Sequence, residues 1–191
     1  MSDPMTQKTV SEFALQSESD LRTALAVADA VPEIKRQVVR EFLQKLKGKL
    51  EAELGRGWRF DEKIADFFEE PYGRFSMWKE SWDGKFYIAL EGQNHLRNGV
   101  VWGVRRDRDK LKGEPNSEIL KRFQKEKYDG KSNRWWECYV YPKEHELRYW
   151  NEAEAIIKLH FQLGEAVEYF KTRMLKAAEI AEPLLDKMCK V

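Results

Sequence analysis

Three polar residues in the middle of the chain have the side chains that divalent-metal nucleases use. Asp83, Glu91 and Gln93 form the pattern of an acid followed by Glu-x-Gln. Glu91 and Gln93 are two positions apart, so they share one face of a strand, as ligands of one ion must. Asp83 does not fit, because a continuous strand over 84–91 advances about 3.3 Å per residue and places it roughly 26 Å from Glu91. Carboxylates that far apart cannot bind one cation, whose oxygen ligands lie ~2–2.6 Å away.

A different acid would have to complete such a site. The candidates for this role are Asp61, Asp66, Glu69 and Glu80. No pattern in the sequence selects one of them, and a lysine on the same strand face is missing. We therefore predict no catalytic residue and no metal ligand, and we expect Glu91 to be a solvated acid that pairs with Arg105 across the ladder. A nuclease that uses Glu91 and Gln93 with a divalent metal is the enzymatic alternative.

The remaining reactive side chains show no known catalytic spacing. His95, His145 and His160 do not form an HxH or HxxxH metal motif. His160 lies in an apolar helical pattern and is expected in a core or an interface. Cys138 and Cys189 form no CxxC motif and are expected to be reduced thiols. No glycine-rich phosphate loop or nucleophile motif occurs, so we predict no cofactor.

The middle of the chain is basic, although the whole chain is nearly neutral. Residues 95–134 hold twelve Lys and Arg against six acids, whereas the formal net charge of the chain is +1. Cations beside exposed aromatic rings can follow phosphates and stack on bases. The candidate surface for nucleic acid or another partner consists of Arg97, Arg105, Arg106, Arg108, Lys110, Lys112, Lys121, Arg122, Lys125, Trp102 and Trp135. The alternative is an ordinary solvated loop and helix face.

These residues must be positioned by strands. All seven tryptophans lie between Trp58 and Trp150, in short segments bounded by Gly, Asp, Asn and Pro. Alternating aromatic and β-branched residues favour a pleated, half-buried surface. The predicted strands are residues 74–82, 86–93, 100–106 and 134–141, which form a four-stranded antiparallel sheet. The first two are joined by a tight turn at Asp83-Gly84. The fourth is apolar on both sides, which predicts a central position or a second covering layer.

Helices are predicted before and between the strands. Residues 1–18 are polar and are expected to form a flexible tail. Apolar residues then predict a short helix over 19–30 and a second helix from Pro32 to about Leu54. Between the third and fourth strands, residues 117–128 are expected to form a short helix.

The end of the chain is predicted to be one long helix. A capping box at 151–154 opens it, and it extends towards Lys190. Apolar residues three and four apart form a heptad seam over 160–188, which Pro183 is expected to kink. We expect the seam to pack on residues 34–54 of the same chain. A homodimer through the seam is the alternative.

One stretch of the sequence has a familiar pattern. The segment SWDGKFYIALEGQ from Ser81 to Gln93, followed by VWGV at 101–104, resembles a segment found after the nuclease domain in some bacterial proteins of the PD-(D/E)XK nuclease superfamily. The Trp135-Trp136 pair, Trp150 and the terminal helix fit the same layout, so the resemblance extends over about 40–188. It implies a non-catalytic accessory region without a nuclease core, and it assigns no catalytic residue.

Composition sets the class of protein. The 191 residues include 35% charged and 42% apolar residues, and no apolar run approaches the ~20 residues of a membrane span. The N-terminus lacks the apolar region of a secretory signal, so a cytoplasmic protein without membrane contact is expected. We predict an α+β fold in which 19–191 form one domain: a helical arm at 19–54, a sheet region at 58–150 and a terminal helix at 152–190.

These observations favour a binding module without enzymatic activity. Large aromatic and Arg side chains are frequent anchors of interfaces, so a protein partner is the first expectation. The resemblance places such a module in bacterial or phage nucleic-acid defence or counter-defence, with a nuclease or defence complex as the partner. A DNA- or RNA-binding protein that uses residues 95–134 is the second expectation, and the divalent-metal nuclease is the third.

Overall fold

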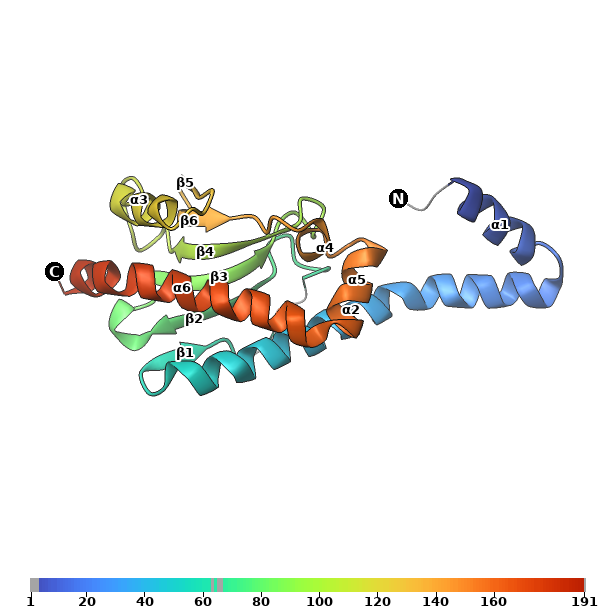
Figure 1. Ribbon diagram of the computed structural model, residues 1–191, viewed down its shortest axis with the longest axis horizontal. Helices are drawn as coiled ribbons and strands as arrows, with labels where there is room; N and C mark the ends of the chain where they lie inside the picture. Colours follow the sequence, from blue (N-terminus) through green and yellow to red (C-terminus); the bar gives the residue numbers. More distant parts are fainter. Residues whose placement is uncertain (1–3, 63, 65–66, 191) are drawn as a thin grey trace.

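An antiparallel sheet organises the fold (Figure 1). The computed structural model describes residues 4–62, 64 and 67–190. Within these residues, six strands pair in the order β1-β2-β3-β4-β6-β5, and all neighbours are antiparallel. The predicted α+β class with an antiparallel sheet is confirmed, whereas the predicted number of four strands is wrong.

The two additional strands are short edge strands. The strands are β1 Trp58–Phe60, β2 Arg74–Lys79, β3 Phe86–Gly92, β4 Val100–Arg106, β5 Lys131–Asn133 and β6 Trp136–Val140. The edge strands β1 and β5 have three residues each, which is too short for alternation to be recognised in a sequence. β6 lies inside the sheet between β4 and β5, as its apolar character on both sides predicted.

The predicted turn between β2 and β3 is present. Asp83 and Gly84 both have positive φ values, 51° and 64°, as a tight hairpin turn requires. The predicted strand over 74–82 is shorter than expected, because its last three residues form the 3-10 helix η1 Glu80–Trp82. This helix buries Trp82, whose indole Nε1 donates to a carboxylate oxygen of Asp186 at 2.7 Å.

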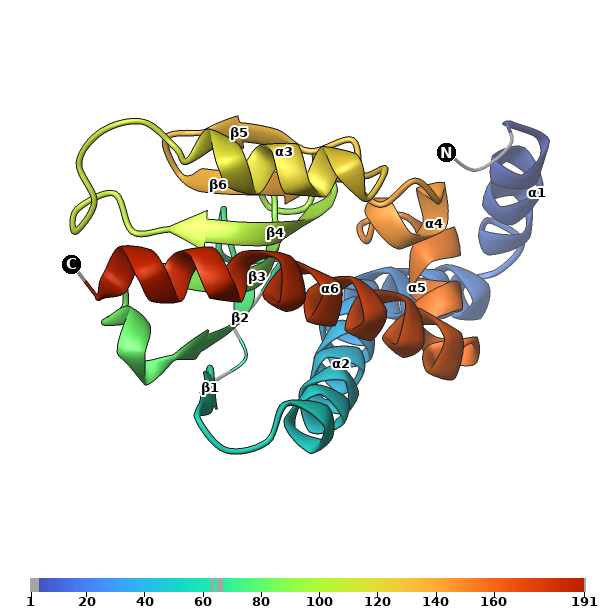
Figure 2. The ribbon, with the colours of Figure 1, turned by 60° about the vertical axis from the view of Figure 1, so that its left-hand side comes forward.

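The helices cover one face of the sheet. In the described part of the chain they are α1 Pro4–Ala14, α2 Glu18–Leu54, α3 Ser117–Lys125, α4 His145–Arg148, α5 Ala153–Phe161 and α6 Leu163–Cys189. Figure 2 shows α6 and α3 on the same side of the strands, while the described residues place no helix on the opposite side. We call this opposite side the open face. None of the described helices has the length and apolar character needed to cross a membrane.

The N-terminal region is more helical than predicted. The segment 1–18, expected to be a tail, contains α1, and the two helices expected on either side of Pro32 form the single helix α2. α2 begins where the Ser17 side chain accepts a hydrogen bond from the Asp20 amide at 3.1 Å. The buried residues of α2 begin only at Val38, so α1 and the first half of α2 form an arm that projects from the sheet (Figure 1).

The C-terminal region forms two helices where one was predicted. α5 and α6 are separated at Gln162, which has φ −115° and ψ 35°. The predicted capping box at 151–154 is wrong, because the N-cap is Glu152 and its side chain makes no capping bond. α6 continues through Pro183 to Cys189. His160, expected in a core or interface, is exposed.

The predicted packing of the terminal seam within the chain is confirmed. Phe170 of α6 meets Phe42 of α2 edge-to-face at 5.6 Å between ring centroids, and Trp150 lies against both rings. Met174 and Ala177 of the seam are fully buried. The alternative of a homodimer would have to use seam residues outside this packed part, because Phe170, Met174 and Ala177 are buried within the monomer. Most tryptophans serve the core, since five of the seven are buried.

Candidate nucleic-acid interface

Alternation along β3 and β4 gives the open face a floor of small residues. Ala89 and Gly103 are opposite each other in the register, and Val101 lies beside them. All three are buried, and Ala89 and Val101 pack with Trp136 in a small apolar cluster separate from the main core. The floor is thus a shallow depression between taller side chains.

Glu91 is held at one end of this floor. Its Oε2 accepts from the Arg105 Nε at 2.9 Å, and its Oε1 accepts from the Gln93 amide nitrogen at 2.8 Å. The small Ala89–Gly103 pair lets the Arg105 side chain lie across two ladder positions to reach Glu91. The predicted pairing of Glu91 with Arg105 is therefore confirmed. The prediction that Glu91 is solvated is wrong, since the residue is only 3% exposed.

The electrostatic balance around Glu91 is positive. Burial raises the pKa of the Glu91 carboxyl, and the charges of Arg105 and Arg74 oppose this rise. Arg74 lies opposite Glu91 in the β2–β3 register and makes no ion pair with any described residue. Two arginines thus act on the Glu91 carboxylate, while Asp107 near Arg105 and Asp61 near Arg74 offset part of their charge.

Trp135 gathers three further cationic contacts at the edge of this face. The guanidinium groups of Arg108, Arg134 and Arg105 lie 4.7, 5.4 and 5.9 Å from the centre of its ring. Trp135 is 36% exposed, and it borders a depression of about 460 Å³ that also contains Glu91. Cation–aromatic contacts of this kind pre-position both the ring and the charges for a partner.

The face continues as a row of rings on β6 and on Tyr141, the residue that follows it. Trp136 and Tyr139 are 6.1 Å apart between centroids, and Tyr139 and Tyr141 are 5.9 Å apart. The Arg148 guanidinium lies 4.0 Å above the Tyr141 ring. On the other side of the floor, Tyr87 meets Trp78 at 5.7 Å. Aromatic rings therefore lie on both sides of the floor of small residues.

The structure divides the predicted binding residues into separate groups. Arg105, Arg108 and Trp135 lie together on the open face. Other residues of this set lie outside the Trp135 cluster. They are Arg97, Lys110 and Lys112 at exposed loop positions, and Lys121, Arg122 and Lys125 in α3.

Two of the predicted residues are not on the surface. Arg106 is 3% exposed and pairs with buried Glu137 at 3.4 Å. Trp102 is 1% exposed on the helix-covered side of β4. The alternation of β4 explains both positions, because residues 102, 104 and 106 share the inward face.

Several residues of the open face were missed by the sequence-based selection. Arg74, Tyr139 and Tyr141 lie outside the basic segment or carry no charge, so a search for concentrated charge did not reach them. Arg134 was counted in the basic segment but not selected. The usable signal was the alternation in β2 and β6, which places Arg74 and Tyr139 on the same side as Arg105.

The other acids considered for a metal site have different partners. Asp61 accepts from the Ser76 amide at 2.7 Å, Glu69 pairs with Arg36 at 3.1 Å, and Glu80 pairs with Arg59. Asp66 lies outside the described residues. In the parts of the chain that the structure covers, no three His, Cys, Asp or Glu side chains come together as metal ligands would.

Comparison with known proteins gives no relative: no family model, no curated protein and no solved structure matches the chain. The resemblance to accessory regions of nuclease-superfamily proteins stays a prediction. The functional argument therefore depends on the geometry of the site.

Proposed function

We propose that the protein is a binding module without enzymatic activity whose open face binds single-stranded nucleic acid. The observation that carries this proposal is a helix-free sheet face bordered by aromatic rings and arginines, with Glu91 as a buried and already paired acid. Stacked bases and neutralised phosphates are the two sources of affinity in single-strand binding. An open sheet face with both kinds of side chain supplies each.

The geometry suggests where the strand would lie. Bases would stack on Trp135 and on the rings of Tyr139 in β6 and Tyr141 just after it, while Arg74, Arg108 and Arg134 would contact phosphates. The Glu91–Arg105 pair would hold the floor rigid and keep Arg105 in place. Because base stacking is tolerant of sequence, we expect weak sequence preference.

Fluorescence anisotropy tests the proposal. We expect the protein to bind a labelled single strand more tightly than a duplex of the same sequence, with affinity that falls steeply as salt increases. The double variant Arg134→Gln/Trp135→Ala should lose about tenfold or more in affinity, since stacking alone is worth about 1–3 kcal/mol per base. The matched control is Lys121→Gln/Lys125→Gln on α3, which removes two cations away from the Trp135 cluster.

Two outcomes would contradict strand binding. One is equal loss of affinity in the α3 control, which would mean that charge alone is responsible. The other is no measurable binding at low salt. The same incubations with Mg²⁺ or Mn²⁺ test the nuclease alternative, because strand cleavage that disappears in Glu91→Ala would replace the binding module with an enzyme.

A separate observation favours a protein partner as a second function. The projecting arm exposes large apolar side chains, namely Val10, Phe13, Leu15, Leu25, Val27 and Ile34. At the base of the arm, Ile157 and Phe161 of α5 are 56% and 79% exposed. Ile34, Ile157 and Phe161 line one groove at this base, and an exposed apolar surface of this kind marks interaction sites on soluble proteins. The arm is therefore the part of the molecule that supports the expectation of a protein partner.

A further inference from the structure

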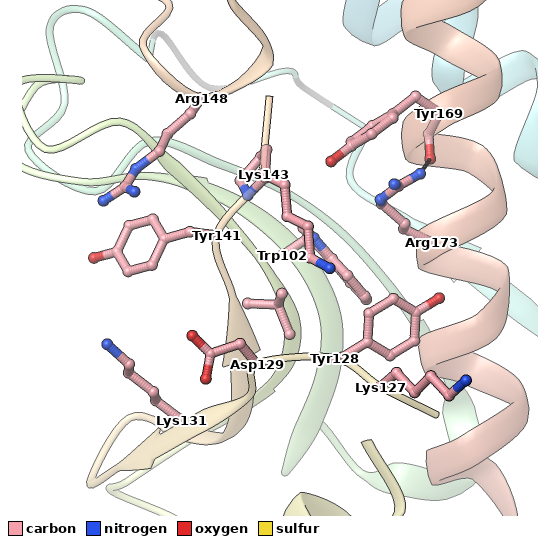
Figure 3. A pocket seen from close by; sticks show the side chains of 12 residues that line it. Trp102, Lys127, Tyr128, Asp129, Lys131, Tyr141, Lys143, Arg148, Tyr169 and Arg173 are labelled. Atoms are coloured by element: carbon pink, nitrogen blue, oxygen red, sulfur yellow. Dashed lines mark hydrogen bonds between the residues drawn. The ribbon is translucent and has the colours of Figure 1, made fainter. Parts of the chain in front are cut away.

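A second pocket lies where the row of rings on β6 ends (Figure 3). It has a volume of about 420 Å³, within the range of small-molecule sites. Lys131, Tyr141 and Arg148 lie on one side of it and Tyr128, Tyr169 and Arg173 on the other. We call it the Tyr128 pocket.

Local structure places these side chains. Helix α3 ends at Lys125, Lys127 just beyond it has φ 64°, and the Tyr128 amide donates back to the Phe123 carbonyl at 3.1 Å. This left-handed helix end turns the chain so that Tyr128 enters the pocket. Tyr169 and Arg173 are one helical turn apart on α6, and the Arg173 guanidinium covers the Tyr169 ring.

The pocket is strongly cationic. Its lining contains Lys127, Lys131, Lys143, Arg148 and Arg173, with Asp129 as the acid of the lining. None of these five cations makes an ion pair with a described residue, whereas Arg105 and Arg106 on β4 are both paired. Five unpaired cations around one concave space favour an anionic ligand.

Two buried donors of the pocket also lack acceptors. The indole Nε1 of Trp102 and the Nε of Arg148 are buried and have no hydrogen-bond acceptor among the described residues. Trp102 is 1% exposed and lies at the back of the pocket (Figure 3). A buried donor without an acceptor is costly, so such groups usually meet a ligand or water oxygen.

The aromatic residues that line the pocket indicate what the uncharged part of the ligand would be. The rings of Tyr128 and Trp102 meet edge-to-face at 5.0 Å, and Tyr141 and Tyr169 lie on opposite sides of the space. Burial raises the pKa of both Tyr141 and Tyr169, so their hydroxyls stay protonated at neutral pH. The walls can therefore stack on a flat ring, and the Tyr141 hydroxyl can donate a hydrogen bond to it, whereas the Tyr169 hydroxyl already donates to the Glu144 carboxylate.

We propose that the Tyr128 pocket binds a nucleoside monophosphate unit, with its phosphate among the lysines and arginines and its base between the tyrosines. The unit is either a free mononucleotide or the phosphorylated end of a strand. This inference goes beyond strand binding by the open face and does not depend on it, because the two sites share Tyr141 but use different lysines and arginines.

Isothermal titration calorimetry of the full chain tests the pocket. The probes are AMP, UMP, adenosine, inorganic phosphate, phosphotyrosine, and a tetranucleotide with and without a 5′-phosphate. We expect AMP and UMP to bind more tightly than either adenosine or phosphate, because each of these supplies only half of the contacts. Tighter binding of the tetranucleotide with a 5′-phosphate than of the one without it identifies a strand end as the source, and equal binding of the two, with AMP bound, identifies a free nucleotide.

Matched variants locate the binding. Lys143→Gln/Arg173→Gln should weaken AMP binding about tenfold or more, because it removes two charge-assisted hydrogen bonds. Arg108→Gln/Arg134→Gln on the open face removes the same charge and should leave AMP binding unchanged. Thermal unfolding of each variant checks that the fold is retained, and Lys131→Gln, on an exposed edge strand, provides a second pocket variant if Arg173→Gln unfolds the protein.

Three results would overturn the proposal. The first is that neither AMP nor UMP binds the wild-type protein. The second is equal loss of binding in the pocket and open-face variants. The third is tighter binding of phosphotyrosine or phosphate than of the nucleotides, which would indicate a phosphoprotein or an anion site. Loss of strand binding in the open-face variants with AMP binding intact would show that the two sites act separately.

Discussion

The two cysteines illustrate how burial sets chemistry at single residues. Burial raises the pKa of the Cys138 thiol to about 12, while Cys189 near the end of α6 is only partly buried. Only the thiolate reacts with disulfide reagents, and at pH 8 on the order of one Cys138 in 10⁴ would be ionised. We expect one thiol of the native protein to react with Ellman's reagent, and both to react in urea. Two thiols reacting at the same rate in the native protein would contradict the buried position of Cys138.

Asp61, a half-buried acid that directly follows β1, gives a pH-dependent prediction. Burial raises the pKa of Asp61, although the Ser76 amide and nearby cations oppose the rise. A raised folded-state pKa means that the stabilising contribution is complete below the unfolded pKa and is lost as pH rises through the folded pKa. Asp61→Asn keeps an acceptor for the Ser76 amide but does not titrate.

Urea unfolding at pH 4 and pH 7 measures this effect. The free energy of unfolding of Asp61→Asn, relative to wild type, should increase from pH 4 to pH 7, because the wild-type protein alone bears the cost of the buried charge. A relative stability that is constant or falls over this range would mean that Asp61 is not desolvated in the folded protein.

The contacts of single residues could be predicted from the sequence where the contacting residues lie in neighbouring elements of the chain. The pairing of Glu91 with Arg105 could be foreseen, because both lie on neighbouring strands of one hairpin. The burial of Glu91 could not, since it depends on β6 and Trp136, which are distant in sequence. The lack of a hydrogen-bond acceptor for the Trp102 indole likewise could not be predicted, because it depends on how α3, α4 and α6 surround the ring.

At the scale of elements, the β4–β6 ladder depends on one glycine. Gly103 has φ 152°, and a β-carbon at this position would overlap the Cys138 carbonyl oxygen of β6. The overlapping atom belongs to the backbone, so it can move only by breaking the ladder. We expect Gly103→Ala to lower the free energy of unfolding by about 2–4 kcal/mol.

The matched control is a glycine in a helix. Gly48 lies in α2, and a β-carbon there meets no atom within 4 Å. Gly48→Ala should raise the free energy of unfolding by about 0.5–1 kcal/mol, because alanine favours the helical backbone. Equal effects of the two substitutions in chemical denaturation would show that β4 and β6 are not closely paired at Gly103.

Elements were predictable where their periodicity was long enough. Seven-residue strands such as β3 and β4 and the amphipathic half of α2 show clear alternation or a clear apolar stripe. β5 has three exposed residues and no such pattern, and it forms because β6 offers its free edge. Local propensity does not indicate the continuation of α2 through Pro32 or the break between α5 and α6 at Gln162.

At the scale of the whole molecule, positive charge is concentrated on particular surfaces, although the net charge of the chain is close to zero. A net charge of +1 gave no indication of an anionic partner, yet the open face and the Tyr128 pocket both carry excess positive charge. The balancing acids lie elsewhere, as in the Lys79–Glu182 and Lys171–Glu53 pairs around α6. Local charge, which depends on the fold, therefore decides the partner better than the sum does.

The arm is structurally separable from the rest of the molecule. The core residues of α2 begin at Val38, while the large apolar residues of α1 and of α2 up to Ile34 are exposed. A chain shortened to begin at Pro32 keeps Lys35, whose ammonium donates to the Asn151 carbonyl at the base of the arm. The shortened chain should therefore unfold within a few degrees of the full chain, because the loss of exposed helix changes buried apolar area little. Affinity for single strands should be unchanged. The shortened chain should no longer bind a protein partner. Sedimentation velocity of mixtures, or of the protein alone at high concentration, measures this loss. A large fall in unfolding temperature would instead make the arm part of the core.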